Sequence, residues 1–223
     1  MKIAILTSLF GVIDTLKTPP KVFEDVDYYA FVDKKHDCEI WQQIISPSFS
    51  LDKDYPNRRN AKIYKIMPHL FLPDYDFWFW LDTTHAVMKN PFEICNKYLK
   101  DSDIALFKHT NRTCAYQEAA EIIKLKVDKL ELVQNQINYY KSEGFPENYG
   151  LFELPVSIRK NTDRIKTLNL MWWEQICKYS SRDQVSMPFV LWKTNINPTI
   201  LPGFGNGGLY ANEFMPQVRH KGK

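Results

Sequence analysis

One carboxylate stands at the end of the most apolar segment of the chain, and its position suggests chemistry. Asp82 directly follows residues 77–81, FWFWL. A short apolar run of this kind predicts a buried strand, which places the carboxylate at a sheet edge close to solvent. Carboxylate oxygens are ligands for Mn²⁺ or Mg²⁺, and a bound diphosphate needs only one or two of them beside the metal. An Asp that caps the turn after a strand is the alternative.

A second polar group is the block Ser181-Arg182-Asp183-Gln184. Arg, Asp and Gln side by side can bind the hydroxyls of a sugar and hold a leaving group or an acceptor. Ser or Asp ahead of a helix is also a common N-cap. Taken alone, the block favours the capping role.

Cations are densest in the stretch that contains Arg58, Arg59, Lys62 and Lys65. Arg58 and Lys62 are four residues apart and would share one face of a helix, with Arg59 close to both. This face could contact phosphates, although a solvated helix face is the usual explanation.

The C-terminal tail offers a further candidate metal ligand in His220, with Lys221 and Lys223 beside it. A histidine can ligate a metal and a lysine can neutralise a diphosphate. A disordered basic terminus is the simpler alternative.

The elements that must position these residues alternate between strands and helices. Apolar, β-branched or aromatic runs predict strands, and apolar residues at helical spacing predict helices. The expected strands are 2–6, 28–33, 40–45, 76–81, 104–107 and 151–158; the expected helices are 57–69, one or two within 114–140, and 163–179, with 184–192 helical or mixed. The tail from Asn197 is rich in Gly and Pro, and we expect it to be irregular.

This alternation predicts an α/β fold with a mostly parallel central sheet flanked by helices. Ligands of such sheets bind outside the carboxyl ends of the strands. The loop at Thr7 and Ser8 that leads to Asp14, the strand end at Asp33 and the strand end at Asp82 all fit that rule. We expect a single domain over residues 1–223, with 114–140 as a helical insertion.

Composition excludes several classes of protein. The net charge of +3 is mild, and the short basic stretch gives no strong nucleic-acid signal. No apolar stretch is long enough for a membrane span. The sequence has no Walker loop, GxGxxG, GxSxG or HExxH motif, which argues against a nucleoside triphosphatase, a dinucleotide enzyme, a serine hydrolase and a zinc protease.

The four cysteines are widely scattered and form no CxxC motif. This predicts buried thiols in a reducing compartment rather than a zinc site or a redox pair. The N-terminal MKIAILTSLFG reads as a first strand rather than a signal peptide. We therefore expect a cytoplasmic protein, or one from a virus or bacterium that acts inside the cell.

An ordered set of segments resembles a known family. The segments are 59–69, 71–76, 80–82, 107–109 with Arg112, 114–119, 143–146, 150–153, 172–174 and 181–186. They resemble a glycosyltransferase-like family, first described without a function, whose plant members include a mucilage-related glycosyltransferase and a protein described as an alkaline ceramidase. The family is similar to nucleotide-sugar transferases with a GT-A (Rossmann-like) fold.

The resemblance implies transfer of a sugar, with a UDP-sugar as the expected donor, to a carbohydrate or other glycan acceptor. It implies Mn²⁺ or Mg²⁺ and the diphosphate at Asp82, and a sugar or acceptor role for Asp183 and Gln184. Thr84 stands where the Asp-x-Asp motif of many such enzymes has its second acid, so a metal-independent variant stays open. His220 would be the metal-ligating histidine of related retaining enzymes, but its spacing departs from their His-x-x-Gly-x-x-Lys motif.

The remaining roles complete this expectation. Thr7, Ser8, Phe10 and Asp33 would hold the nucleoside, and the phosphate or sugar side would be lined by Arg59, Lys62 and Lys65. The lack of an evident base favours a retaining reaction. Two other classes stay open: a lipid amide hydrolase, from the ceramidase description, and a nucleic-acid-binding or nucleic-acid-modifying protein.

Overall fold

The computed structural model describes residues 1–11, 14–203 and 214–216. Its strands are β1 (Ile3–Leu9), β2 (Asp27–Val32), β3 (Gln42–Ile45), β4 (Phe77–Leu81), β5 (His85–Val87), β6 (Ile104–Lys108), β7 (Phe152–Lys160), β8 (Thr199–Leu201) and β9 (Phe214–Pro216). Its helices are α1 (Pro56–Ile66), α2 (Pro68–Phe71), α3 (Pro91–Tyr98), α4 (Ala115–Lys124), α5 (Leu130–Ser142), α6 (Asp163–Lys178) and α7 (Asp183–Thr194).

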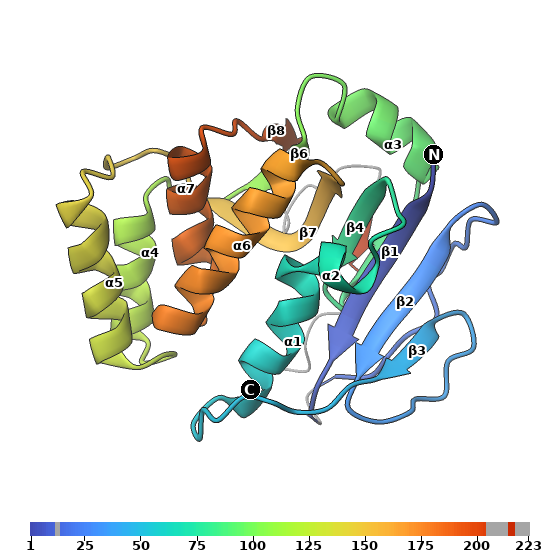
Figure 1. Cartoon of the computed structure of the whole chain (residues 1–223), viewed down its shortest axis with the longest axis horizontal. Helices are drawn as coiled ribbons and strands as arrows, with labels where there is room; N and C mark the ends of the chain where they lie inside the picture. The colour runs from blue at the N-terminus through green and yellow to red at the C-terminus, as the bar shows by residue number, and fades with distance from the viewer. Residues whose placement is uncertain (12–13, 204–213, 217–223) are drawn as a thin grey trace.

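Seven of these strands form one central sheet in the order β3-β2-β1-β4-β7-β6-β8 (Figure 1). The pairs β3–β2, β2–β1, β1–β4 and β6–β8 are parallel, and β7 runs antiparallel to both β4 and β6. A small second sheet pairs β5 with β9. The expected α/β class is confirmed: this is the mostly parallel, helix-flanked sheet that the resemblance to GT-A enzymes implies.

Both faces of the central sheet are buried. Along β1, Ala4 and Leu6 pack in the apolar cluster that holds α1, α6 and α7, while Ile3 and Ile5 pack in the cluster on the other face, which holds α3. Burial on both faces explains why the strands read as continuous apolar runs rather than as alternating patterns.

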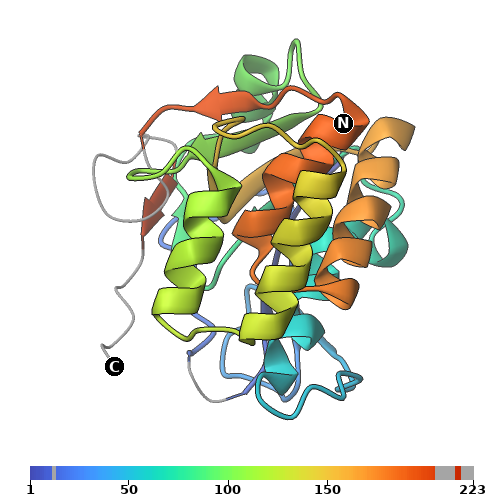
Figure 2. The ribbon, with the colours of Figure 1, turned by 90° about the vertical axis from the view of Figure 1, so that its left-hand side faces the viewer.

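The helical layer is two helices deep on one side of the sheet. α7 contacts β7, α6 and α4, and α4 in turn packs against α5. Figures 1 and 2 show α4 and α5 side by side on the outside of this layer. They form the helical region predicted over 114–140, as two helices between β6 and β7. That this region is an insertion stays a prediction.

Buried Arg159 on β7 fixes α1 against the sheet. Its guanidinium donates to the backbone oxygens of Lys65 and Ile66, at the C-terminal end of the helix, and to the side chain of Asn169 on α6. A cation at this end also suits the helix dipole. The side chains that α1 presents near the sheet edge are thereby held in place.

Three local predictions were wrong. The helix expected over 57–69 ends at Ile66, and α2 begins at Pro68, because the residue before a proline is disfavoured in the helical region. β5 and α3 were not predicted, since both are short. The tail is not wholly irregular, because β8 adds to the edge of the sheet beside β6 and β9 pairs with β5.

Two further expectations concern the burial of the cysteines and the absence of a membrane span. Cys38, Cys95 and Cys114 are buried as predicted, but Cys177 is exposed on α6, where a helix turns one side to solvent. None of the helices among the described residues has the length and apolar character needed to cross a membrane.

Candidate functional site

A cleft of about 420 Å³ opens at the edge of the sheet where β1 and β4 end. Its walls come from the loop after β1, from α1, from the turn after β4 and from the start of α7. Of the residues predicted from the sequence, it brings together Ser8, Phe10, Lys62, Lys65, Asp82, Asp183 and Gln184. These residues are far apart in the sequence, and the sheet and two helices gather them.

The charges of the cleft centre on Asp183, the first residue of α7. Lys62 Nζ lies 2.9 Å from its Oδ1, and Lys65 Nζ lies 2.7 Å from its Oδ2. Burial alone would raise the pKa of Asp183, but the two ammonium groups hold that pKa well below its usual value. Asp183 is therefore ionised at neutral pH and is a weak base.

Asp82 follows β4 and is more open to solvent. Its backbone N–H donates to Pro155 O at 2.7 Å, which anchors the residue to β7. Trp80 Nε1 donates to Oδ1 at 2.8 Å, and Lys65 Nζ lies 3.7 Å from the same oxygen. The side chain is 44% exposed, so this carboxylate is oriented by its neighbours and still reachable by a ligand.

Two arginines extend the positive charge of the cleft. Arg182 precedes α7, and its Nε is buried with no hydrogen-bond acceptor among the described residues. Arg58 on α1 donates to Val127 O at 2.7 Å. Burial lowers the pKa of Arg58, and the nearby charge of Arg182 lowers it further. Two guanidinium groups that repel each other at one cleft favour the binding of an anion between them.

The start of α7 adds backbone donors to the same wall. Arg182 occupies the N-cap position, and no side chain caps the helix there. The first N–H groups of a helix have no partner within it and carry partial positive charge. Together with Arg182 they suit a phosphate group.

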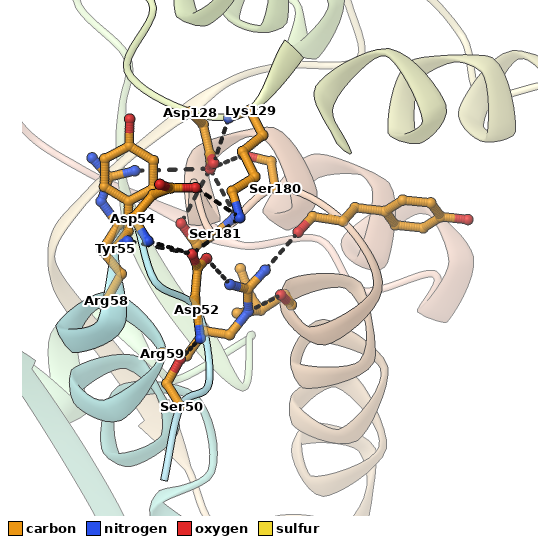
Figure 3. Close-up of polar contacts among 12 residues, drawn as sticks. Ser50, Asp52, Asp54, Tyr55, Arg58, Arg59, Asp128, Lys129, Ser180 and Ser181 are labelled. Atoms are coloured by element: carbon orange, nitrogen blue, oxygen red, sulfur yellow. Dashed lines mark hydrogen bonds and ion pairs between the residues drawn. The ribbon is translucent and has the colours of Figure 1, made fainter. Parts of the chain in front are cut away.

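A buried carboxylate outside the cleft holds the turn that precedes α7 (Figure 3). Asp128 Oδ2 accepts from Ser180 Oγ at 2.8 Å, from Ser181 N at 3.0 Å and from Ser181 Oγ at 3.1 Å. The same oxygen lies 3.8 Å from Arg58 Nη1. The loop between α4 and α5 is thereby tied to both cationic walls of the cleft.

Arg59, predicted to contact the phosphate or sugar, does not line the cleft. It pairs with Asp52 at 2.6 Å and donates to the backbone oxygens of Ile176 and Tyr179, at the end of α6 (Figure 3). Burial opposes ionisation of Asp52, but the backbone amides of Asp54 and Tyr55 and the cations Lys129 and Arg59 lower its pKa to about 2. This network joins α1 to α6 rather than to a ligand.

The N-terminal candidates lie at different depths. Ser8 Oγ donates to Ala61 O at 3.0 Å and reaches the cleft wall. Phe10, also on the wall, stacks near Tyr64 with 5.9 Å between ring centroids. Thr7 is buried in β1 and is not on the cleft wall.

Asp33 shapes the loop after β1 rather than the cleft surface. Its Oδ2 accepts from Gly11 N at 2.7 Å. Gly11 has a φ of +88°, and a Cβ there would lie 2.5 Å from Nδ2 of Asn57, a residue of the cleft wall. The backbone conformation therefore favours glycine, and any other residue would also displace the Asn57 side chain on the cleft wall.

Two predicted site residues remain, the cofactor-binding candidate Thr84 and the metal candidate His220. Thr84 is buried, and its Oγ1 hydrogen-bonds to His85 Nδ1 at 2.9 Å instead of facing the cleft. His220 lies outside the described residues.

Several cleft residues were not among the predicted site residues. Asp14 and Thr83 both line the cleft, and Thr83 Oγ1 donates to Asp14 Oδ2 at 3.1 Å. Arg58 and Arg182 line it as well. The sequence positions of the two arginines could have indicated that they belong to the site. Arg182 stands beside Asp183 in the polar block, and Arg58 shares a helix face with Lys62.

The cleft fits a divalent ion in part. The described residues contain no group of three His, Cys, Asp or Glu side chains that could hold a metal alone. The cleft does offer the open carboxylate of Asp82, with Asp14 on the same wall. Mg²⁺ sites for nucleotides commonly use one or two carboxylates, with phosphate oxygens and water as the other ligands. This donor set fits a metal that arrives with a diphosphate.

Three solved structures are distantly similar in shape. Bifunctional glycosyltransferase WbbM in its apo form has a TM-score of 0.43 and 12% identity, over 90% of this chain and 39% of that one. The Mn/GDP form of core-mannan synthase A from Aspergillus fumigatus has 0.46 and 9%, over 86% and 69%. The galactosyltransferase LgtC with donor and acceptor sugar analogues has 0.44 and 11%, over 85% and 70%. Similarities at this level assign neither a ligand nor a reaction to this chain.

Sequence comparison identifies a family. An Arabidopsis thaliana protein described as probable hexosyltransferase MUCI70 is 23% identical over 218 residues, which cover 84% of this chain. The chain spans only 37% of the length of that relative. The family model described as TOD1/MUCI70, glycosyltransferase-like domain, matches residues 1–205, and the chain therefore belongs to this glycosyltransferase-like family.

Proposed function

We propose that this domain transfers a sugar from a nucleotide-diphosphate sugar, with UDP as the expected nucleotide, to a glycan acceptor. The observation that carries the proposal is the charge pattern of the cleft. Arg58, Lys62, Lys65 and Arg182 line it together with the carboxylates Asp82 and Asp183. Family membership favours this activity over the lipid amide hydrolase and the nucleic-acid-binding protein considered from the sequence.

The cations match the leaving group of the reaction. When the bond between the sugar and the diphosphate breaks, negative charge develops on the phosphate oxygens. Preorganised cations and backbone N–H groups stabilise such charge without reorganising at the moment of reaction. Arg182, the uncapped start of α7 and Lys65 would bind the diphosphate and stabilise it as it leaves.

The carboxylate of Asp183 suits the positive charge that develops on the sugar. The sugar ring gains positive character in a transition state that resembles an oxocarbenium ion. Asp183 stays ionised because of its two lysines, so it can accept hydrogen bonds from sugar hydroxyls and stabilise that positive charge. Gln184 beside it can donate and accept hydrogen bonds on the sugar or acceptor side.

A divalent ion, Mn²⁺ or Mg²⁺, would be held by Asp82, with Asp14 on the same wall. When bound, the ion would neutralise charge on the diphosphate. Asp82 does not need the ion for its orientation, because hydrogen bonds with Trp80 and Pro155 already fix this residue.

Two finer points belong to the proposal. A retaining course of the transfer is favoured because Asp183, the carboxylate paired with the lysines of the cleft, is a weak base.

A cytoplasmic location is in keeping with the four free thiols, Cys38, Cys95, Cys114 and Cys177.

Nucleotide binding tests the proposal directly. Thermal unfolding is measured with UDP, GDP and their sugars, each with and without Mn²⁺. A nucleotide at 100 times its Kd should stabilise the protein by about 2.7 kcal/mol, which appears as a rise of several degrees in Tm. If no nucleotide diphosphate raises the Tm, the transferase proposal fails. If fatty acid is released from a ceramide instead, the hydrolase alternative replaces it.

The role of Asp82 is tested by Asp82→Asn, which keeps the shape of the side chain. We expect the Mn²⁺-dependent part of the UDP-induced Tm rise to disappear while the Tm without ligand stays the same. Asp74→Asn is the matched control, because Asp74 is exposed and lies away from the cleft. Unchanged Mn²⁺-dependent binding in Asp82→Asn would remove Asp82 from this role.

A further inference from the structure

A second cavity of about 550 Å³ adjoins the cleft. The two share Arg182 and Gln184, which line both of them. The second cavity lies between the end of β6 and α4, which do not line the first one, while β7 lines both, through Glu153 here and through Leu154 and Pro155 there. A molecule bound in it would lie directly beside whatever occupies the cleft.

Three polar side chains that line this cavity are buried. His109 is 8% exposed, Glu118 4% and Glu153 3%. Glu118 Oε2 accepts from Arg112 Nε at 2.7 Å. Glu153 Oε1 accepts from Thr110 N at 3.1 Å and from Thr110 Oγ1 at 2.6 Å. These groups are held in fixed positions, as a binding site requires.

An unsatisfied donor on the shared wall points to a ligand. Arg182 Nε is buried and has no acceptor among the described residues. A buried polar group without a partner costs free energy, and a missing ligand is one explanation for it. A hydroxyl or phosphate oxygen of a substrate between the cleft and the cavity would satisfy it.

The charges of the cavity indicate the class of ligand. Its described carboxylates are Glu118, Glu121 and Glu153, and its described guanidinium groups are Arg112 and Arg182. Burial lowers the pKa of His109, and the nearby Arg112 lowers it further, so the imidazole is neutral at pH 7. An excess of carboxylates disfavours an acidic ligand, whereas carboxylates, guanidinium and amide groups all suit neutral hydroxyls.

We propose that this cavity is the acceptor site, that it binds a neutral saccharide through Glu118, Glu153 and Arg112, and that Arg182 and Gln184 separate it from the donor cleft. The identification of the ligand as an acceptor rests on the proposed transferase function. The presence of a saccharide site does not, because it depends only on the residues of the second cavity.

Saccharide binding to the whole chain is measured by saturation-transfer NMR and calorimetry, with UDP and Mn²⁺ present. The probes are cellotetraose, xylotetraose, mannotetraose and galactotetraose, with trigalacturonic acid as the acidic comparison. We expect at least one neutral probe to bind and trigalacturonic acid to bind at least tenfold more weakly. Binding of the acidic probe alone, or of none of them, would overturn the proposal.

Variants locate the site. Glu153→Gln keeps the size of the side chain, and Leu125→Trp adds bulk to the cavity wall from an exposed position. Each should weaken binding of the neutral probe at least tenfold and leave the UDP-induced Tm rise unchanged. Glu147→Gln, on an exposed residue outside the cavity, should change neither.

The outcomes separate the two proposals. Wild-type saccharide affinity in Leu125→Trp would overturn the acceptor site even if Glu153→Gln fails to fold. If the saccharide binds and the variants lose it, but UDP causes no Tm rise in any protein, the saccharide site stands and the transferase function fails.

Discussion

At the scale of single residues, Asp183 balances the charges of the cleft. Asp183→Asn leaves Lys62 and Lys65 facing each other without their shared carboxylate. Breaking a buried pair by removing one partner costs about 3–5 kcal/mol, and we expect a loss at the lower end of that range in urea unfolding. Asp25→Asn, on an exposed residue, serves as the control. A stability equal to that of the control would contradict the importance of these ion pairs.

Asp52 gives a residue-scale prediction that depends on pH. Its native pKa of about 2 lies below the value near 4 of an unfolded chain. The ionised group therefore stabilises the fold above about pH 4, by about 2 kcal/mol, and this stabilisation is lost as the pH falls toward 2. Asp52→Asn should be less stable than the wild type at pH 7, and the difference should shrink between pH 4 and pH 2. A difference that does not vary with pH would contradict this.

At the scale of elements, the turn before α7 depends on the loop between α4 and α5. Asp128→Asn keeps the size of the side chain but replaces an acceptor oxygen that receives three hydrogen bonds. We expect faster hydrogen exchange at residues 180–184 and weaker UDP binding by about tenfold, which corresponds to about 1.4 kcal/mol. Asp101→Asn, exposed and distant from the turn, should show neither change. Faster exchange with unchanged UDP affinity would show that the turn does not position the cleft residues.

The loop after β1 gives a second element-scale prediction, with a glycine pair as its internal control. Gly11 and Gly144 both have positive φ, of +88° and +75°, but only at Gly11 would a Cβ meet a neighbour, Nδ2 of Asn57. Gly144→Ala should cost about 1 kcal/mol from backbone strain alone. Gly11→Ala should cost slightly more and should also weaken UDP binding, because the Asn57 side chain on the cleft wall must move. Equal losses of stability with unchanged UDP affinity would contradict the close approach.

At the scale of the whole molecule, local patterns predicted the frame of the fold and the centre of the cleft. Residues 77–81 are a buried strand, and Asp82 lies at its carboxyl end, because a run of large apolar residues has no other favourable place. The helix spacing that groups Arg58 with Lys62 was also informative. The predicted ligand contact is Arg59, whereas Arg58 lines the cleft. One residue along a helix turns a side chain by about 100°, which is enough to direct Arg59 to Asp52.

Contacts between distant segments could not be predicted. Nothing local to Asp183 indicates that Lys62 and Lys65 would pair with it, since that depends on how α7 packs beside α1. Likewise, the hydrogen bonds from Ser180 and Ser181 to Asp128 join two loops that have no common pattern. The short strands β8 and β9 form because neighbouring strands offer them hydrogen bonds, which a Gly- and Pro-rich tail does not reveal.

The central claim is that the cleft at the end of β4 binds a nucleotide diphosphate and its metal. A crystal structure of the protein soaked with UDP and Mn²⁺ tests it most directly. We predict diphosphate density between Arg182 and Asp82, and an anomalous manganese peak beside the Asp82 carboxylate. Nucleotide density elsewhere on the protein, or a manganese peak with no contact to Asp82, would contradict the claim.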